Sequence, residues 1–266
     1  MAPASEPASS RQVTWAIYDA PPFMVTAGDD RDRGIFDRIR RLLNERLDGY
    51  AHRTITAPFP RIYKALTNGA EWCFVGGIRN PEREEFAVFS LPVAMFYPLR
   101  IIVRRGRQER FAAMEPLSLR RLLQDRRDLR TSVLRARTMA PAIDALLREH
   151  PPAQTHSEFE EAFRMLLNDR LDYLVEFSSI AAYSAGHLGR DGDLVALPFA
   201  EAPEPVLSRV MCAKTEWGRA VIERIDEILR RERPGPAYRA IVEAWADGPD
   251  RETIRRAYDT VFLTAR

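Results

Sequence analysis

Apolar residues recur along the chain in two patterns, as short continuous runs and as longer stretches with one apolar face. The run from Val13 to Tyr18 stops at two prolines, which predicts a strand followed by a loop. Between Ile35 and Leu47 the apolar residues are spaced mainly three and four positions apart, which predicts an amphipathic helix. The next segments predict a strand, a helix and a strand, over residues 51–57, 60–69 and 71–77. The first ninety residues therefore predict a β-α-β-α-β unit with a parallel sheet.

The rest of the chain follows a similar plan. Further strands are predicted over residues 97–105, 129–136, 171–177, 193–201 and 206–215. Further helices are predicted over residues 118–125, 140–150, 157–170, 178–186, 216–232, 236–246 and 251–266. We expect two lobes, the first formed by residues 13–102 together with 197–266 and the second by residues 103–196. Two connections between lobes form a hinge, and ligands favour the cleft between hinged lobes.

Composition narrows the function classes. The chain has 266 residues, 45% of them hydrophobic, which is enough for a sizeable core. Forty Lys and Arg against 38 Asp and Glu give a net charge of +2, which argues against a nucleic-acid-binding protein. No apolar run reaches the ~18 residues of a membrane span. Residues 1–12 lack the apolar core of a signal peptide and offer no face to bury, so we expect a disordered tail.

The two cysteines do not suggest a metal site. Cys73 and Cys212 lie in apolar runs, which favours two buried thiols, with a disulfide as the alternative in an oxidising compartment. The sequence has no Cys/His spacing typical of zinc. It also lacks a GxSxG elbow, a phosphate-binding glycine loop and an HExxH motif. We therefore expect no metal and no cofactor.

Six short motifs occur in an order and spacing that resemble one known family. They are YDAPPF, GIFDRI, FPRIYKALTNG, NPERE…FS, NDRLDYLVEF and CAKTEWG, at residues 18–23, 34–39, 59–69, 80–90, 168–177 and 212–218. Over roughly Val13 to Trp245 the chain resembles the periplasmic solute-binding proteins for polar amino acids, solute-binding protein family 3. The resemblance implies an α/β, two-lobed type II periplasmic-binding-protein fold, with a mainly parallel sheet in each lobe. It also implies a periplasmic location after removal of a signal peptide, and delivery of the solute to a membrane permease of an ABC transporter. We expect a monomer.

The resemblance assigns a ligand-binding role to Arg83, which follows the third predicted strand. In the family the arginine at this place binds the carboxylate of the ligand, and a planar guanidinium can do so with two parallel hydrogen bonds. Gly77 ends the strand before it, where a glycine lets the backbone approach a ligand closely. The alternative is that Arg83 pairs with Glu82, Glu84 or Glu85 on a solvated turn.

Three further positions match the family, each with a plainer alternative, and two arginines lie beside the third. Asp19 matches an acidic residue that contacts the ligand in the family. Its alternative role is to cap the proline-rich turn. Phe59 matches an aromatic residue that packs on the ligand, or belongs to the core. Thr138 precedes a predicted helix, where a hydroxyl and helix amides form an anion site, or it is only the N-cap. Arg137 and Arg135 add positive charge there, or face solvent.

Two positions depart from the family pattern. Ile78 stands where amino-acid-binding members place a hydroxyl that holds the ammonium group of the ligand. Phe177 occupies the position where the family has the aspartate that completes the ammonium site. Glu176 lies beside it and is the candidate to replace that aspartate. Because Arg83 is retained while the ammonium partners differ, we expect an anionic or carboxylate-bearing solute, which weakens the case for an α-amino acid.

Three functions follow from these observations. The first is non-catalytic solute binding, in a transporter or as a sensor. The second is a dehydratase-like enzyme on the same scaffold, with Glu176 as a general acid whose pKa is raised by apolar neighbours such as Tyr173. The third is a structural or protein-interaction role with a degenerate cleft.

Overall fold

The computed structural model describes residues 12–96, 98–202, 205–244 and 248–266. Of the predicted disordered tail, residues 1–11 lie outside this part, and Gln12 is the first residue of a strand. Residue 97 of one predicted strand and residues 245–246 of one predicted helix also lie outside it.

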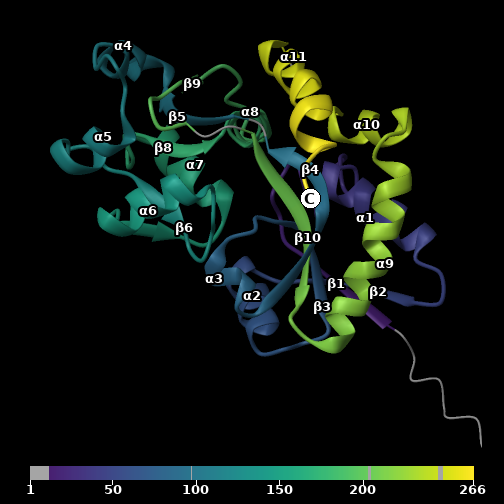
Figure 1. Ribbon diagram of the computed structural model, residues 1–266. Helices are drawn as coiled ribbons and strands as arrows, with labels where there is room; N and C mark the ends of the chain where they lie inside the picture. The colour runs from purple at the N-terminus through teal and green to yellow at the C-terminus, as the bar shows by residue number, and fades with distance from the viewer. Residues whose placement is uncertain (1–11, 97, 203–204, 245–247) are drawn as a thin grey trace, which may run out of the picture.

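Lobe 1 contains a five-stranded mixed sheet (Figure 1). Its strands are β1 (Gln12–Ile17), β2 (Ala51–Thr56), β3 (Trp72–Gly77), β4 (Ala87–Phe96) and β10 (Val206–Ala213). Their order is β2-β1-β3-β10-β4, with β1 parallel to β2 and β3, and β10 antiparallel to β3 and β4. The helices of this lobe are α1 (Ile35–Arg46), α2 (Phe59–Thr67), α3 (Pro81–Glu84), α9 (Glu216–Glu232), α10 (Pro236–Val242) and α11 (Gly248–Ala257), followed by the π-helical turn η2 (Tyr258–Phe262).

Lobe 2 contains two small sheets. Strands β5 (Leu99–Arg104), β8 (Leu174–Phe177) and β9 (Leu194–Leu197) form one in the order β8-β5-β9, and β6 (Ser132–Leu134) pairs with β7 (Gln154–His156) in the other. The helices are η1 (Arg105–Arg107), α4 (Gln108–Ala112), α5 (Leu119–Asp125), α6 (Pro141–Glu149), α7 (Phe159–Leu167) and α8 (Ser178–His187). Both pairings of β5 are antiparallel, so the expectation of a mainly parallel sheet was wrong for this lobe. The reason is that β5 carries the chain away from lobe 1, whereas β8 and β9 run back toward it.

The chain crosses between the sheets twice. The first crossing lies between Phe96 and Leu99, and the second between Leu197 and Val206. The strand β5, which the predicted boundary at residue 102 divides between the lobes, pairs with β8 and β9 in the second sheet. Val206 and Phe96 are partners in the β10–β4 ladder, so the two crossings leave lobe 1 side by side (Figure 1).

The core of lobe 1 lies between its sheet and helices and includes a disulfide. The α1 residues Ile35, Ile39 and Leu43 are fully buried, as their spacing predicted. Cys73 of β3 and Cys212 of β10 are opposed in the ladder and joined by a disulfide. Of the two alternatives for the cysteines, the structure therefore has the disulfide instead of the free thiols we favoured. In the described part of the chain, no helix has the length and apolar character needed to cross a membrane.

Candidate functional site

Arg83 is turned inward by the short helix α3. The Asn80 side chain caps this helix by accepting a hydrogen bond of 2.8 Å from the Arg83 backbone N–H, and Pro81 occupies its first turn. Only 2% of Arg83 is exposed, although it lies in a stretch of charged residues. The local sequence thus places a guanidinium between the lobes.

The Arg83 guanidinium bridges the two lobes. It donates one hydrogen bond of 3.2 Å to the Ile78 carbonyl in lobe 1 and another of 3.2 Å to the Ala136 carbonyl in lobe 2. Its Cζ lies 5.5 Å from the centre of the Phe59 ring. Burial lowers the pKa of Arg83, and the nearby Asp144 carboxylate opposes this shift. The cation therefore contacts carbonyl oxygens and an aromatic face.

Two of the three neighbouring glutamates have other partners. Glu82 accepts a hydrogen bond of 2.7 Å from the Tyr63 hydroxyl, and Glu84 forms an ion pair with Arg79. The structure therefore does not favour the alternative in which Arg83 pairs with these side chains on a solvated turn.

A second guanidinium, Arg137, forms a buried ion pair with Glu176 in lobe 2. Nη2 of Arg137 lies 2.6 Å from Oε1 of Glu176, and Nη1 contacts Oε2. The two side chains are only 8% and 6% exposed. The Arg137 guanidinium also lies 4.5 Å from the centre of the Phe159 ring and 5.4 Å from that of Phe177. Burial raises the pKa of the Glu176 carboxyl, while the Arg137 charge opposes this shift.

Asp19 makes local hydrogen bonds, whereas Thr138 makes one that crosses between the lobes. The Asp19 carboxylate accepts bonds of 2.9 Å and 2.7 Å from the backbone N–H and the hydroxyl of Thr26, as its capping alternative proposed. The Thr138 hydroxyl accepts a bond of 3.3 Å from the Asn80 side chain across the lobes. Helix α6 begins at Pro141, so Thr138 precedes the N-cap by two residues and does not cap the helix as its alternative role required.

The two glycines that end β3 have different surroundings. A Cβ on Gly77 would lie 2.7 Å from Cβ of Met211, so this residue packs against β10. Gly76 has a φ of +111°, and a Cβ there would lie 2.4 Å from the Phe36 ring. Gly76, together with Ile78, borders the central interlobe cavity. The sequence-based choice of Gly77 thus missed the neighbour that lies at the cavity.

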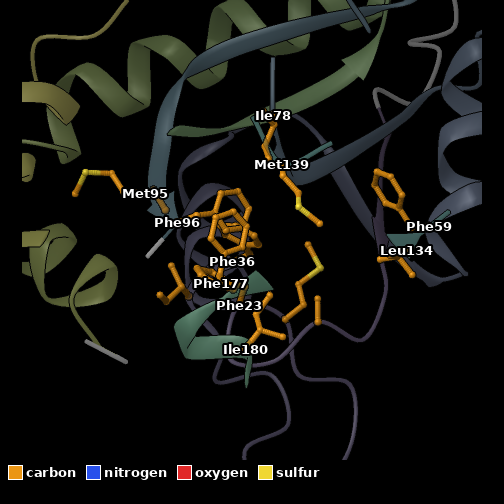
Figure 2. Close-up of a cluster of buried hydrophobic side chains, with 14 of the residues drawn as sticks. Phe23, Phe36, Phe59, Ile78, Met95, Phe96, Leu134, Met139, Phe177 and Ile180 are labelled. Atoms are coloured by element: carbon orange, nitrogen blue, oxygen red, sulfur yellow. The ribbon is translucent and has the colours of Figure 1, made fainter. Parts of the chain in front are cut away.

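The central cavity between the lobes is small and mainly aromatic. Its volume is about 20 Å³, which is room for about one water molecule. Phe23, Phe36 and Phe96 line it, and Figure 2 shows them grouped with Phe177, whose ring stacks on that of Phe96 across the lobes at 4.5 Å. Other aromatic residues that line it are Tyr18, Phe59 and Phe74. The lobes are therefore closed around their own side chains.

Two larger hollows flank the cleft and differ in charge. One of about 680 Å³ is bordered by arginines from both lobes, namely Arg83, Arg135, Arg137 and Arg148, and by two carboxylates, Glu82 and Asp144. The other, of about 530 Å³, is bordered by Asp19, Glu158, Glu160, Glu161, Arg164, Tyr183 and His187. The first is an outer basic hollow, and the second is an acidic hollow.

Arg148 and Asp144 were missed as candidates for the outer basic hollow. They lie four residues apart on α6, so both side chains belong to one helix face. The sequence already showed this spacing in the helix that follows Thr138, and it could have identified both residues.

The buried imidazole of His156 gives a pH-dependent prediction. Its Nδ1 lies 2.8 Å from the Ser132 hydroxyl, and burial, with the Arg137 charge, lowers its pKa to about 4. The unfolded chain takes up this proton near pH 6.5, so protonation favours unfolding as the pH falls from 6.5 to 4. We expect the His156 contribution to reduce the free energy of unfolding by about 3 kcal/mol across this window.

Urea unfolding of the wild type and H156N at several pH values measures this contribution. Asparagine retains a polar atom near Ser132 but does not titrate. The free energy of unfolding of H156N should therefore change less than that of the wild type between pH 6.5 and 4. An equal dependence of the free energy of unfolding on pH in the two proteins would show that His156 does not contribute to it.

Sequence comparisons give no match to this chain. No protein-family model matches it, and no curated protein matches it in sequence.

Solved structures do match. The VFT2 domain of Bordetella pertussis BvgS (double mutant F375E/Q461E) has a TM-score of 0.65 and 20% identity, over 88% of this chain and 93% of that one. A histidine kinase sensor domain similar to periplasmic binding proteins has a TM-score of 0.70 and 18% identity, over 89% and 96%. An arginine transport system periplasmic binding protein from Legionella pneumophila has a TM-score of 0.66 and 16% identity, over 89% and 100%.

These neighbours are periplasmic binding proteins and sensor domains, and their similarity to this chain spans both lobes. The resemblance expected from the motifs is thus confirmed at the level of the fold. The chain has the two-lobed type II periplasmic-binding-protein fold.

Proposed function

We propose that this protein binds a small carboxylate-bearing solute between its lobes without transforming it, as the solute-binding component of a transporter or as a sensor. The observation that supports this most is the outer basic hollow, where Arg83 of lobe 1 meets three arginines of lobe 2. Guanidinium groups bind carboxylates through charge-assisted hydrogen bonds. A volume of about 680 Å³ lies in the range of small-molecule sites.

The charge of the two hollows supports an anion at the first. Four arginines and two carboxylates border the outer basic hollow, whereas carboxylates predominate at the acidic hollow. An α-amino acid is less well supported, because both oxygens of Glu176 already contact Arg137 and Ile78 brings no hydroxyl. The same engagement of Glu176 argues against the dehydratase alternative, in which this side chain must donate a proton.

A periplasmic location is part of the proposal. The Cys73–Cys212 disulfide supports it, because such bonds persist in oxidising compartments. Structural neighbours include a transport-system binding protein and a sensor domain. The proposed partner is accordingly a membrane permease or a sensor module, and the protein would act as a monomer.

Replacing Arg83 tests the proposal. We expect one or more small mono- or dicarboxylates to raise the Tm of the wild type, whereas the matching amides do not. For such a solute, R83A should weaken binding about 100-fold, because two charge-assisted hydrogen bonds of ~1.5 kcal/mol each are lost. Calorimetric titration of the wild type, R83A and R83K measures this, and R83K covers the case in which R83A does not fold.

The control is R79A. Arg79 is an exposed arginine just before α3, and it pairs with Glu84. The variant should bind the solute as the wild type does. If no carboxylate raises the Tm, or if both Arg83 variants retain full affinity for one that does, the proposal is wrong.

A further inference from the structure

The Arg137 side chain has the environment of a bound ligand. Glu176 contacts both terminal nitrogens of its guanidinium, and the Phe159 and Phe177 rings lie near the same group. A carboxylate combined with aromatic faces is a general way for a protein to bind an organic cation. Within this site the cation is supplied by the chain itself.

The loop that carries Arg137 is held by both lobes. Its neighbours Ala136 and Thr138 accept hydrogen bonds from Arg83 and Asn80 of lobe 1. Lobe 1 also supplies Tyr18, whose ring stacks on Phe159 at 6.2 Å. The loop therefore makes favourable contacts in the closed arrangement that are absent when the lobes separate. A solute favours closure in the same way, by binding the closed arrangement more tightly than the open one.

The cleft centre leaves no space for a second cation beside Arg137. The cavity that Arg137 borders there measures about 20 Å³, and both oxygens of Glu176 are engaged. Arg137 also borders the outer basic hollow of about 680 Å³. Removal of its side chain would thus create a cation-sized space that opens toward this hollow.

We propose that Arg137 is a tethered internal ligand, whose guanidinium fills an organic-cation site at the centre of the cleft and excludes free amines and guanidines from Glu176. This inference does not rest on the proposed carboxylate binding, which depends on Arg83. A failure of either proposal leaves the other standing.

The test is chemical rescue of R137A with ethylguanidinium, the fragment that this substitution deletes. R137A leaves the buried Glu176 carboxylate unpaired, and we expect its Tm to fall by about 10 °C. Ethylguanidinium at 10 mM should raise the Tm of R137A by at least ~3 °C and bind with 1:1 stoichiometry in calorimetry. The wild type should show neither effect. The longer cation butylguanidinium should also bind R137A, because its uncharged tail can extend into the outer basic hollow.

Three controls separate the site from general effects. Ethylurea has nearly the same shape without the charge, and it should not stabilise R137A. R137A/E176Q lacks the carboxylate, so it should be at least as stable as R137A and should not respond to ethylguanidinium. R164A removes an exposed arginine that pairs with Glu160, and it should neither lose stability nor gain a response.

Two results would overturn the inference. One is an equal response of the wild type, or of R137A/E176Q, to ethylguanidinium. The other is the absence of any response in folded R137A. If R137A cannot be isolated folded, its refolding yield is compared in ethylguanidinium and in ethylurea. A higher yield with the cation supports the inference, and equal or zero yields contradict it.

Discussion

Replacing Gly76 with alanine is expected to lower the free energy of unfolding by about 3–5 kcal/mol, and the Tm by roughly 10 °C. Gly76 has a φ of +111°, where side chains are strained, and its Cβ would lie 2.4 Å from the buried Phe36 ring. That ring packs against Phe23 and Phe96 beside the central cavity, so it cannot move without disturbing them. Urea unfolding followed by circular dichroism measures the loss.

G106A is the matched control for G76A. A Cβ on Gly106 would have no heavy atom within 4 Å, and its φ lies outside the positive region. We expect a change within about 1 kcal/mol, because the main effect is on the entropy of the unfolded chain. Equal stabilities of the two variants would show that the Phe36 ring can move away from Gly76 at little cost.

Removal of the disulfide is expected to have an effect of similar size. The C73A/C212A variant loses a cross-link between residues separated by 139 positions. In the chain-entropy model a loop of this length stabilises the protein by about 5 kcal/mol, and measured losses are commonly about 2–5 kcal/mol. Unfolding of the wild type in urea, with and without a reductant, should reproduce the difference between the wild type and the variant.

The controls for the disulfide are direct. The C73A/C212A variant should unfold identically with and without reductant. The wild type should show no free thiol when it is denatured without reductant, and two after reduction. Two thiols in the unreduced protein, produced in an oxidising compartment, would contradict the disulfide.

Sequence periodicity predicted most elements but could not supply all strand directions. Residues 35–47 and 216–232 have clear helical spacing, and both form helices. The ten-residue strand Ala87–Phe96 was not assigned, because its apolar run shows no clean alternation and follows a charged turn. Pairing direction depends on where the chain enters each lobe, which local pattern does not encode. This is why the antiparallel pairs of β5 were missed.

Those features of the site that depend on nearby residues could be predicted from the sequence, whereas those that depend on the tertiary fold could not. The inward position of Arg83 depends on the cap made by Asn80, only three residues away, and the motif was therefore informative. The pair between Arg137 and Glu176 joins residues 39 positions apart, so only the tertiary fold brings them together. The sequence suggested both as ligand contacts but could not show that they contact each other.

The position of Phe96 has a mechanical consequence. It is paired with Val206 where β4 ends and β10 begins, and it stacks on Phe177 of lobe 2. Two connections between lobes form a hinge, and a contact beside the hinge changes less than a distant one when the lobes separate. The contact between Phe96 and Phe177 would therefore persist on opening, whereas the bond of Asn80 with Thr138 would be lost, as would the bond of Arg83 with Ala136. Because that bond crosses from one lobe to the other, its length would report the angle between the lobes.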